Sequence, residues 1–152
     1  MEGVVVRDMA YTDLPSVLVV AQQSFSTPWE INSFKHEIEN KEAILKVALS
    51  ASELVGYVCI RTLLDVTHIM DIAVLSEYRQ QGIGSRLLQD ALKTLQHTSP
   101  DVRQVTLEVR ESNSSAIRLY NKHGFSVKGK RKGYYKNPVE DALIMGFDRE
   151  GL

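Results

Sequence analysis

The segment from residue 66 to residue 109 restricts the fold of this chain more than any other part of the sequence. It opens with the strand-forming run VTHIMDIAVL (66–75) and closes with a second such run, QVTLEV (104–109). The residues between them, over 83–97, have the period of an amphipathic helix, with apolar side chains at Leu87, Leu88, Ala91, Leu92 and Leu95. Because a strand, a helix and a strand in succession place the two strands in one sheet and parallel, this segment predicts a parallel pair.

The remaining segments add further strands and helices to this unit. Runs rich in strand formers predict strands at 4–7, 43–51, 53–62, 125–131 and 140–147. Apolar periodicity predicts a helix at 12–25, and we expect two further helices at 30–39 and at about 114–123. We expect Thr12 to cap the first helix and Gly124 to end the last one in the left-handed conformation. The strands at 43–51 and 53–62 are separated only by Ser52, so we expect them to form an antiparallel hairpin. The fold class is therefore α/β (α+β mixed), with a mixed sheet of about seven strands and about four helices.

Length, composition and charge predict one domain over residues 1–152. The chain is 43% hydrophobic and 24% charged, which is typical of a globular protein, and its net charge of −1 does not favour direct nucleic-acid binding. No apolar stretch approaches the roughly 18 to 20 residues of a membrane span, and no export signal is recognisable, so we expect a cytoplasmic protein without a membrane partner. The one cysteine, Cys59, predicts a buried thiol, no internal disulfide and no metal site. A monomer and a weak dimer both stay open.

Two glycines, Gly82 and Gly84, stand between the first parallel strand and the helix, in the run YRQQGIGSRLL (78–88). Glycine lets backbone N–H groups converge at a helix N-terminus, where the helix dipole favours an anion, so a phosphate group is a natural ligand. Arg79 would add a charged donor. A plain strand-to-helix turn is the alternative. The run lacks the third small residue and the downstream acid of a dinucleotide site, and the Lys with Ser or Thr of a P-loop.

The wider sequence resembles that of a known enzyme family. The run IAVLSEYRQQGIGSRLL is similar to the acetyl-CoA motif of the GNAT superfamily of N-acetyltransferases, and the runs LEVRESNSSAIRLYNKHGF and RKGYYKNPVEDALIM resemble the RimI-type ribosomal-protein-alanine N-acetyltransferases. The resemblance spans nearly the whole chain. It implies a single-domain GNAT fold, with a mostly antiparallel central sheet that is splayed between its two parallel strands.

The resemblance also implies acetyl-CoA as the co-substrate. Its pantetheine arm would pair with the backbone of Ile72, Ala73 and Val74, because its two amides can act as an extra strand. The thioester would then lie where the parallel strands part, and ligands commonly bind at the carboxyl ends of such strands. The implied pyrophosphate contacts are Gln80, Gln81, Gly82, Ile83, Gly84 and Ser85, with Arg79 and Asn113 as further cofactor contacts. Asn113 also suits the N-cap of the helix that follows it.

Two residues are candidates for the chemistry. Glu108 alternates with the apolar residues of its strand, and position alone favours a solvated carboxylate. The resemblance instead assigns Glu108 as the base that takes a proton from the incoming amine, directly or through water. Tyr120 lies one helical turn after Ala116, where packing with a satisfied hydroxyl is the alternative. The resemblance assigns Tyr120 as the acid that protonates the departing CoA thiolate. His68 is a rival base on the neighbouring strand.

The substrate side is less defined. The basic run KGKRKGYYK (128–136) is by default a solvated strand and loop, and contact with CoA, with substrate or with solvent only all stay open. Two adjacent aromatic residues, Tyr134 and Tyr135, follow Gly133 in this run. The resemblance implies that this loop and the segment around Pro28 and Trp29 line a peptide groove. Trp29 and Tyr135 are therefore the candidate substrate-binding residues.

The function implied by the resemblance is acetylation of the N-terminal α-amino group of a protein, the alanine of a small-subunit ribosomal protein, by direct attack. At pH 7 an α-amino group with a pKa near 7.7 is roughly 15 to 20% neutral, against about 0.04% for a lysine side chain, so one glutamate suits the N-terminal amine better. A GNAT enzyme that acts on lysine side chains or on a small amine is the first alternative. A non-catalytic CoA-binding module is the second, and the joint presence of Glu108 and Tyr120 argues against it.

Overall fold

Seven strands form one sheet in the computed structural model, which describes residues 3–149. Their order across the sheet is β1-β2-β3-β4-β5-β7-β6. The strands are β1 (Val4–Asp8), β2 (Ala43–Ser50), β3 (Glu53–Leu63), β4 (Val66–Val74), β5 (Gln104–Arg110), β6 (Ser126–Tyr135) and β7 (Glu140–Asp148). Within the described residues β4 and β5 alone are parallel, and β2 and β3 form an antiparallel hairpin. The predicted mixed, mostly antiparallel sheet is confirmed. The expected domain bounds include residues 1–2 and 150–152, which lie outside the described residues.

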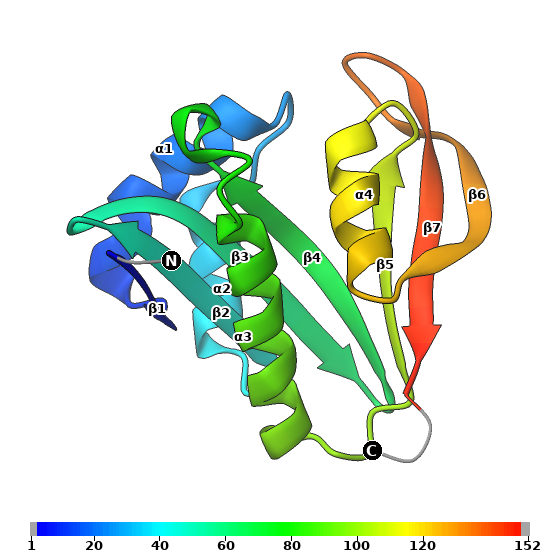
Figure 1. The fold of residues 1–152 in the computed structure, drawn as a ribbon, viewed down its shortest axis with the longest axis horizontal. Coiled ribbons are helices and arrows are strands. Elements are labelled where there is room, and N and C mark those ends of the chain that lie inside the picture. Colours follow the sequence, from blue (N-terminus) through cyan, green and yellow to red (C-terminus); the bar gives the residue numbers. More distant parts are fainter. Residues whose placement is uncertain (1–2, 150–152) are drawn as a thin grey trace.

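Helices cover both faces of this sheet. They are α1 (Leu14–Ser24), α2 (Ile31–Glu39), α3 (Ile83–Thr98) and α4 (Ser114–Lys122), with short 3-10 turns η1 (Tyr11–Asp13) and η2 (Ser76–Tyr78). Figure 1 shows α3 and α4 in front of the sheet and α1 and α2 behind it. Behind the sheet, the buried rings of Phe34 in α2 and Tyr57 in β3 pack edge to face with 5.3 Å between centroids. The predicted stripe of α3 is buried at Leu87, Leu88, Ala91 and Leu95.

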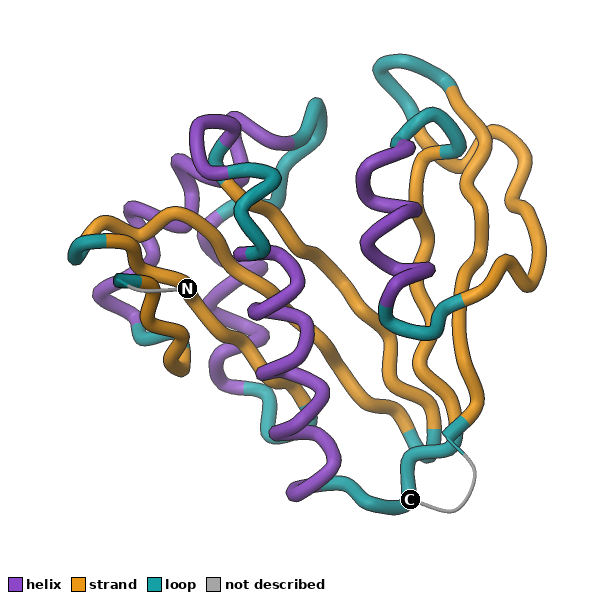
Figure 2. The backbone as a smooth tube through the Cα atoms, viewed as in Figure 1, coloured by secondary structure: helices purple, strands orange, loops and turns teal. Residues whose placement is uncertain are grey.

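The two parallel strands touch only at their amino ends. Pairing joins Val66 to Gln104, Thr67 to Val105 and His68 to Thr106, and no later residue of β4 pairs with β5. Figure 2 shows the two strands close together at one end and diverging toward their carboxyl ends. The sheet is thus open between β4 and β5 over the carboxyl halves of both strands. The residues there have backbone groups and side chains that no neighbouring strand covers.

The start of the first helix differs from the sequence prediction. Thr12 lies in the turn η1, and α1 begins at Leu14 with no side chain capping it, so the prediction that Thr12 is the N-cap is wrong. Asp13 occupies the cap position instead. Its carboxylate accepts hydrogen bonds of 2.7 and 2.8 Å from Arg7 of β1 and one of 2.8 Å from the Ala10 amide. A tertiary contact with β1 therefore sets the turn, against the local preference of threonine for the cap.

The core and the surface agree with the composition. Cys59 is fully buried in β3, as expected, and burial raises the pKa of its thiol. No helix within residues 3–149 combines the length and the apolar composition needed to cross a membrane.

Candidate active site

The open edge of β4 carries the first group of predicted cofactor contacts. The amide of Leu75, which follows β4, donates a hydrogen bond of 2.8 Å to a backbone carbonyl of β3. Hydrogen-bonded and non-hydrogen-bonded positions alternate along an antiparallel pair. The backbone groups of Ala73 therefore face β3, whereas those of Ile72 and Val74 face the opening. The Val74 carbonyl accepts a hydrogen bond of 2.8 Å from Nε of Arg79. Arg79 thus lies at the opening, anchored to the end of the strand.

The glycine turn places the start of α3 beside this edge. Gly82 directly precedes the helix with φ 84°, and Gln80 has φ 62°, so the turn passes twice through the left-handed region that favours glycine. No side chain caps α3, and its first internal hydrogen bond runs from the Arg86 amide to the Gly82 carbonyl over 3.0 Å. The first-turn amides therefore have no intrahelical partner. These are the amides of Ile83, Gly84 and Ser85.

Helix α4 approaches the first turn of α3 across the opening. A Cβ atom on Gly84 would lie at an ordinary contact distance of 3.5 Å from Cδ2 of Leu119, so Leu119 of α4 packs directly over this position of α3. Ser85 Oγ lies 2.6 Å from Nε2 of His123. Burial, with the nearby Lys122, lowers the pKa of His123, which favours a neutral ring hydrogen-bonded to this serine. The sequence offered no signal for His123 beyond its place before the helix-ending glycine.

Both ends of α4 agree with the sequence prediction. Asn113 is the N-cap, and its Oδ1 accepts a hydrogen bond of 3.2 Å from the Ala116 amide. Gly124 follows the helix with φ 90°, which is the predicted left-handed termination. Asn113 is exposed at the carboxyl end of β5, beside the opening.

Glu108 faces the opening from β5, and its side chain is 11% exposed. Its Oε1 lies 2.8 Å from Nε2 of His68 on β4, but the ring N–H is not directed at the oxygen and Nε2 makes no hydrogen bond. The Tyr134 hydroxyl lies 3.5 Å away on the other side. The His68 ring first, and then Arg131 and Tyr134, hold the pKa of Glu108 below its usual value although partial burial opposes them. Glu108 is thus ionised at neutral pH.

Tyr120 projects from α4 toward the same opening and is 5% exposed. Its ring packs against Phe125, with 5.6 Å between centroids. Burial raises the pKa of Tyr120, and the charges of Asp71 and Tyr135 add to the effect. The phenol is therefore fully protonated at neutral pH and is a hydrogen-bond donor.

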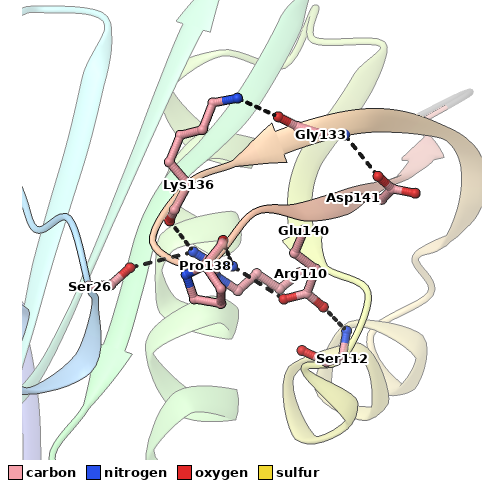
Figure 3. Close-up of polar contacts among 8 residues, drawn as sticks. All are labelled: Ser26, Arg110, Ser112, Gly133, Lys136, Pro138, Glu140 and Asp141. Carbon is pink, nitrogen blue, oxygen red and sulfur yellow. Dashed lines mark hydrogen bonds and ion pairs between the residues drawn. The ribbon is translucent and has the colours of Figure 1, made fainter.

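Arg110, at the end of β5, ties together two loops at the mouth of the opening (Figure 3). Its guanidinium donates to the carbonyls of Lys136 and Pro138 over 2.9 and 3.0 Å, to Glu140 over 3.2 Å and to Ser26 Oγ over 3.4 Å. Glu140 in turn accepts a hydrogen bond of 2.7 Å from the amide of Ser112, two residues before α4. Because Ser26 belongs to the α1–α2 connection and the other partners to the β6–β7 hairpin, Arg110 holds these two segments against β5.

The tip of the β6–β7 hairpin is irregular, and the irregularity directs its aromatic residues. Gly133 has φ 63°, and its amide donates to Oδ1 of Asp141 over 2.8 Å, at the point where the β6 register shifts (Figure 3). The Tyr135 ring then lies under the Arg110 guanidinium, with 4.5 Å from Cζ to the ring centroid. Burial raises the pKa of Tyr135 to about 12. Tyr134 meets the same ring edge-on at 5.0 Å.

The side chains of the basic run 128–136 do not all point the same way. Lys130 pairs with the exposed Glu111 over 3.1 Å. Arg131 lies over the Tyr134 ring at 5.6 Å and acts on the pKa of Glu108. Part of the run therefore faces the site, and part of it faces solvent.

Trp29 belongs to a neighbouring cavity behind the sheet. Its ring lies 5.2 Å from that of Phe34. The cavity has a volume of about 450 Å³ and is lined by Trp29, Asn32, Ser33, His36, Glu37, Arg61 and Met70. Glu37, only 3% exposed, forms an ion pair of 2.8 Å with Arg61. Trp29 and Met70 of β4 thus line this cavity together.

The opening thus brings together Glu108, Tyr120 and Tyr135, three residues that the sequence singled out. Two residues in the same place were not singled out, Arg110 and Asp71. Their charges gave no signal because an arginine or an aspartate in a strand is by default solvent-exposed. Within residues 3–149 no group of three or more His, Cys, Asp or Glu side chains is arranged to hold a metal ion.

These features define a class of protein. The sheet is open between its parallel strands, an uncapped helix N-terminus lies beside the opening, and a carboxylate and a phenol face it from β5 and α4. This is the arrangement of an acetyltransferase. The chain belongs to the acetyltransferase (GNAT) family, whose family model matches residues 14–125.

Relatives within the family are similar over almost the whole chain. A Bacillus subtilis (strain 168) protein, provisionally named a ribosomal protein bS18-alanine N-acetyltransferase, is 40% identical over 92% of this chain and 92% of its own length. The Escherichia coli (strain K12) enzyme of the same name is 31% identical over 92% and 94%. The crystal structure of the Escherichia coli ribosomal-protein-S18-alanine N-acetyltransferase has a TM-score of 0.85 at 28% identity and covers 98% of both chains. Arabidopsis thaliana NAA60 in complex with acetyl-CoA has a TM-score of 0.86 at 20% identity over 96% and 99%, which is a likeness of fold.

Proposed function

We propose that this acetyltransferase transfers the acetyl group of acetyl-CoA to the N-terminal α-amino group of a ribosomal protein, the alanine of bS18. The proposal rests above all on the likeness, over 92% of the chain, to the Bacillus and Escherichia proteins of that name. The site supports it, because the mouth of the opening lies between two loops that Arg110 joins, and aromatic residues line it. The acceptor is part of the cytoplasmic ribosome, so the reaction would take place in the cytoplasm.

Acetyl-CoA would enter along the open edge of β4. The outward amides of Ile83, Gly84 and Ser85 would hold the diphosphate, because they have no other partner and lie at the positive end of the helix dipole. The backbone groups of Ile72 and Val74 would pair with the pantetheine amides. The same fold holds acetyl-CoA in Arabidopsis NAA60, which supports this placement.

Glu108 would act as the base. As the nitrogen bonds to the carbonyl carbon of the thioester, it becomes positively charged and strongly acidic, so even a carboxylate of low pKa can accept its proton, directly or through one water. The lowered pKa of Glu108 has the advantage that the group is ready in its ionised form at any pH near neutrality. The carbon–sulfur bond then breaks, and the electron pair leaves on the sulfur.

Tyr120 would stabilise that sulfur. Its pKa is raised above the usual 10, whereas a thiol has a pKa near 8.5, so a complete transfer of the phenol proton is uphill. A hydrogen bond from the phenol to the thiolate costs far less and is worth about 1.5 to 3 kcal/mol for a charged acceptor. The thiolate can therefore be held by Tyr120 until a proton reaches it.

The test is an acceptor panel. The protein is incubated with acetyl-CoA and three acceptors: a peptide with the bS18 amino terminus, the same peptide with a blocked amino terminus and a free lysine, and a polyamine. We expect thiol release, and the mass of one added acetyl group, with the first acceptor only. Acetylation of lysine or polyamine alone would refute the substrate assignment, and CoA binding without any transfer would indicate a binding module. The same assay compares the variant Glu108→Gln with Glu111→Gln. The second variant is the matched control, because Glu111 lies three residues further on and is exposed.

A further inference from the structure

Asp71, in the middle of β4, is a carboxylate that the proposed mechanism does not use. Its Oδ2 accepts a hydrogen bond of 2.6 Å from the hydroxyl of Tyr57, a fully buried residue of β3. Its second oxygen accepts no hydrogen bond from another side chain within residues 3–149. Asp71 as a whole residue is only partly buried.

The position of Asp71 is set by a break in the sheet. It lies three residues after His68, the last residue of β4 that pairs with β5. In the pairing of β3 with β4, Cys59 lies opposite Asp71 and Ile60 lies opposite Ile69, so the residue before Asp71 is extra. That residue, Met70, lines the cavity beside Trp29. The residue after Asp71 faces the open edge, so Asp71 lies where the cavity and the opening meet.

No cation of the described residues neutralises Asp71. The cation nearest along this face of β3 is Arg61, and it is already paired with Glu37 over 2.8 Å. No Lys, Arg or His within residues 3–149 forms an ion pair with Asp71. A partly buried carboxylate without a cation is costly and is normally found only where something else compensates for it. Asp71 is near enough to Tyr120 for its charge to contribute to the raised pKa of that phenol.

We propose that Asp71 is a further catalytic residue: its carboxylate receives the incoming α-ammonium group as a hydrogen-bonded ion pair and takes the first of the two protons that leave the nitrogen. This inference rests on the proposed function. An α-ammonium group must lose one proton before its nitrogen can attack and a second one after the bond to carbon has formed. The first proton passes to Asp71 and on to solvent. The second passes to Glu108, and the net reaction delivers one proton to the sulfur and one to solvent.

The acid strengths of the two carboxylates fit this division. Burial raises the pKa of Asp71 to about 6, although the Tyr57 hydroxyl and the Ile72 amide oppose it, whereas the pKa of Glu108 lies below 4.5. Proton transfer from an α-ammonium group of pKa near 7.7 is about 50-fold uphill to Asp71 and further uphill to Glu108. Asp71 is therefore the better acceptor for the first proton.

Three of the titratable groups around Asp71 do not titrate with it. On the same face, or packed against it, lie Tyr57, Cys59 and Arg61 of β3, Glu37 of α2 and Tyr120 of α4. Burial raises the pKa values of the two phenols and of the thiol, so all three stay protonated between pH 5 and 8. Arg61 and Glu37 hold each other as an ion pair. A limb near pH 6 in the plot of kcat/KM against pH is assigned to Asp71 if Asp71→Asn removes it, and a limb that persists in that variant belongs to another group of the site, such as His68 beside Glu108.

The experiment measures kcat/KM against pH for the bS18 amino-terminal peptide with the wild type, Asp71→Asn and Tyr57→Phe. Asp71→Asn keeps an oxygen for the Tyr57 hydroxyl but loses the charge. We expect its kcat/KM at pH 7 to fall about 100-fold, the limb near pH 6 to disappear, and the deficit to shrink toward pH 9, where the amine is already neutral. Tyr57→Phe removes a donor that lowers the pKa of Asp71, so the limb should move to higher pH. CoA affinity by calorimetry should change in neither variant. Asp101→Asn, at an exposed aspartate in the loop before β5, is the matched control.

The outcomes separate this inference from the proposed function. If the wild type does not acetylate the α-amine, the proposed function fails and the role of Asp71 fails with it. If the wild type is active and Asp71→Asn has the same kcat/KM and the same limb near pH 6, the catalytic role of Asp71 is refuted and the proposed function stands. If Asp71→Asn no longer binds CoA, the Tyr57→Phe profile decides, and an unshifted limb overturns the inference. A deficit of Asp71→Asn that stays constant up to pH 9, while that of Glu108→Gln shrinks, would reverse the two roles.

Discussion

Replacing Asp71 by asparagine should make the protein more stable at neutral pH. The substitution removes a partly buried charge that has no cation partner, and it leaves an amide oxygen to accept the hydrogen bond of 2.6 Å from Tyr57. The pKa of Asp71 rises from 3.8 to about 6 because the group is buried. At about 1.4 kcal/mol per pH unit, the ionised carboxylate lowers the free energy of unfolding by up to about 3 kcal/mol.

The sign follows from proton binding. The folded state holds the proton more tightly than the unfolded state, so the wild type has its full stability below about pH 4 and loses it as the pH rises through about 6. Asparagine does not titrate. The gain of the variant over the wild type should therefore be near zero at about pH 4, should grow between about pH 4 and 6, and should stay constant above that range.

The assay is urea unfolding of both proteins at several pH values between about 4 and 8, with Asp101→Asn as the control that should match the wild type throughout. A difference in unfolding free energy that does not vary with pH would show that the pKa of Asp71 is not raised. A variant that loses stability as the pH rises would show that a cation compensates the carboxylate. Either result would remove the physical basis for a role of Asp71 in proton transfer.

Three further predictions concern the remaining parts of the site. Glu108→Gln should lower kcat/KM at pH 7 by about 10² to 10⁴, with CoA affinity unchanged in calorimetry, and near-normal turnover would move the role of base elsewhere. Tyr120→Phe should slow the chemical step by about 10 to 10³ in single-turnover kinetics, and by less with an acyl donor whose thiol is more acidic; equal losses with both donors would reduce Tyr120 to packing. Gly84→Glu should abolish CoA binding, whereas Gly84→Ala should retain the fold and most of the affinity, because a Cβ atom there meets Leu119 at an ordinary 3.5 Å. Gly84 is a better test position than Gly82, where φ of 84° would strain any side chain.

Features that depend on neighbouring residues in the chain could be predicted from the sequence alone. Runs of strand-forming residues and helical periodicity located the seven strands and four helices of residues 3–149, and the strand-helix-strand order predicted the parallel pair that the structure contains. Asn113 at a helix start and Gly124 at a helix end were predictable because capping is a contact within one turn. The glycine run and the long RimI-like runs indicated the family for the same reason, since a motif is a local pattern.

Features that depend on which strands become neighbours were decided only by the tertiary structure. Arg7 reaches Asp13 from β1 and so displaces the cap expected at Thr12, and Arg110 finds its partners in two loops that are distant in the sequence. The contrast between Glu108 and Asp71 is of the same kind. Both are carboxylates in strands, and the sequence gives no reason to separate their pKa values. Register places a histidine beside one and only a buried phenol beside the other, and because the pKa of a carboxylate responds to burial and nearby charge, the fold alone makes one a weaker base and the other a stronger one.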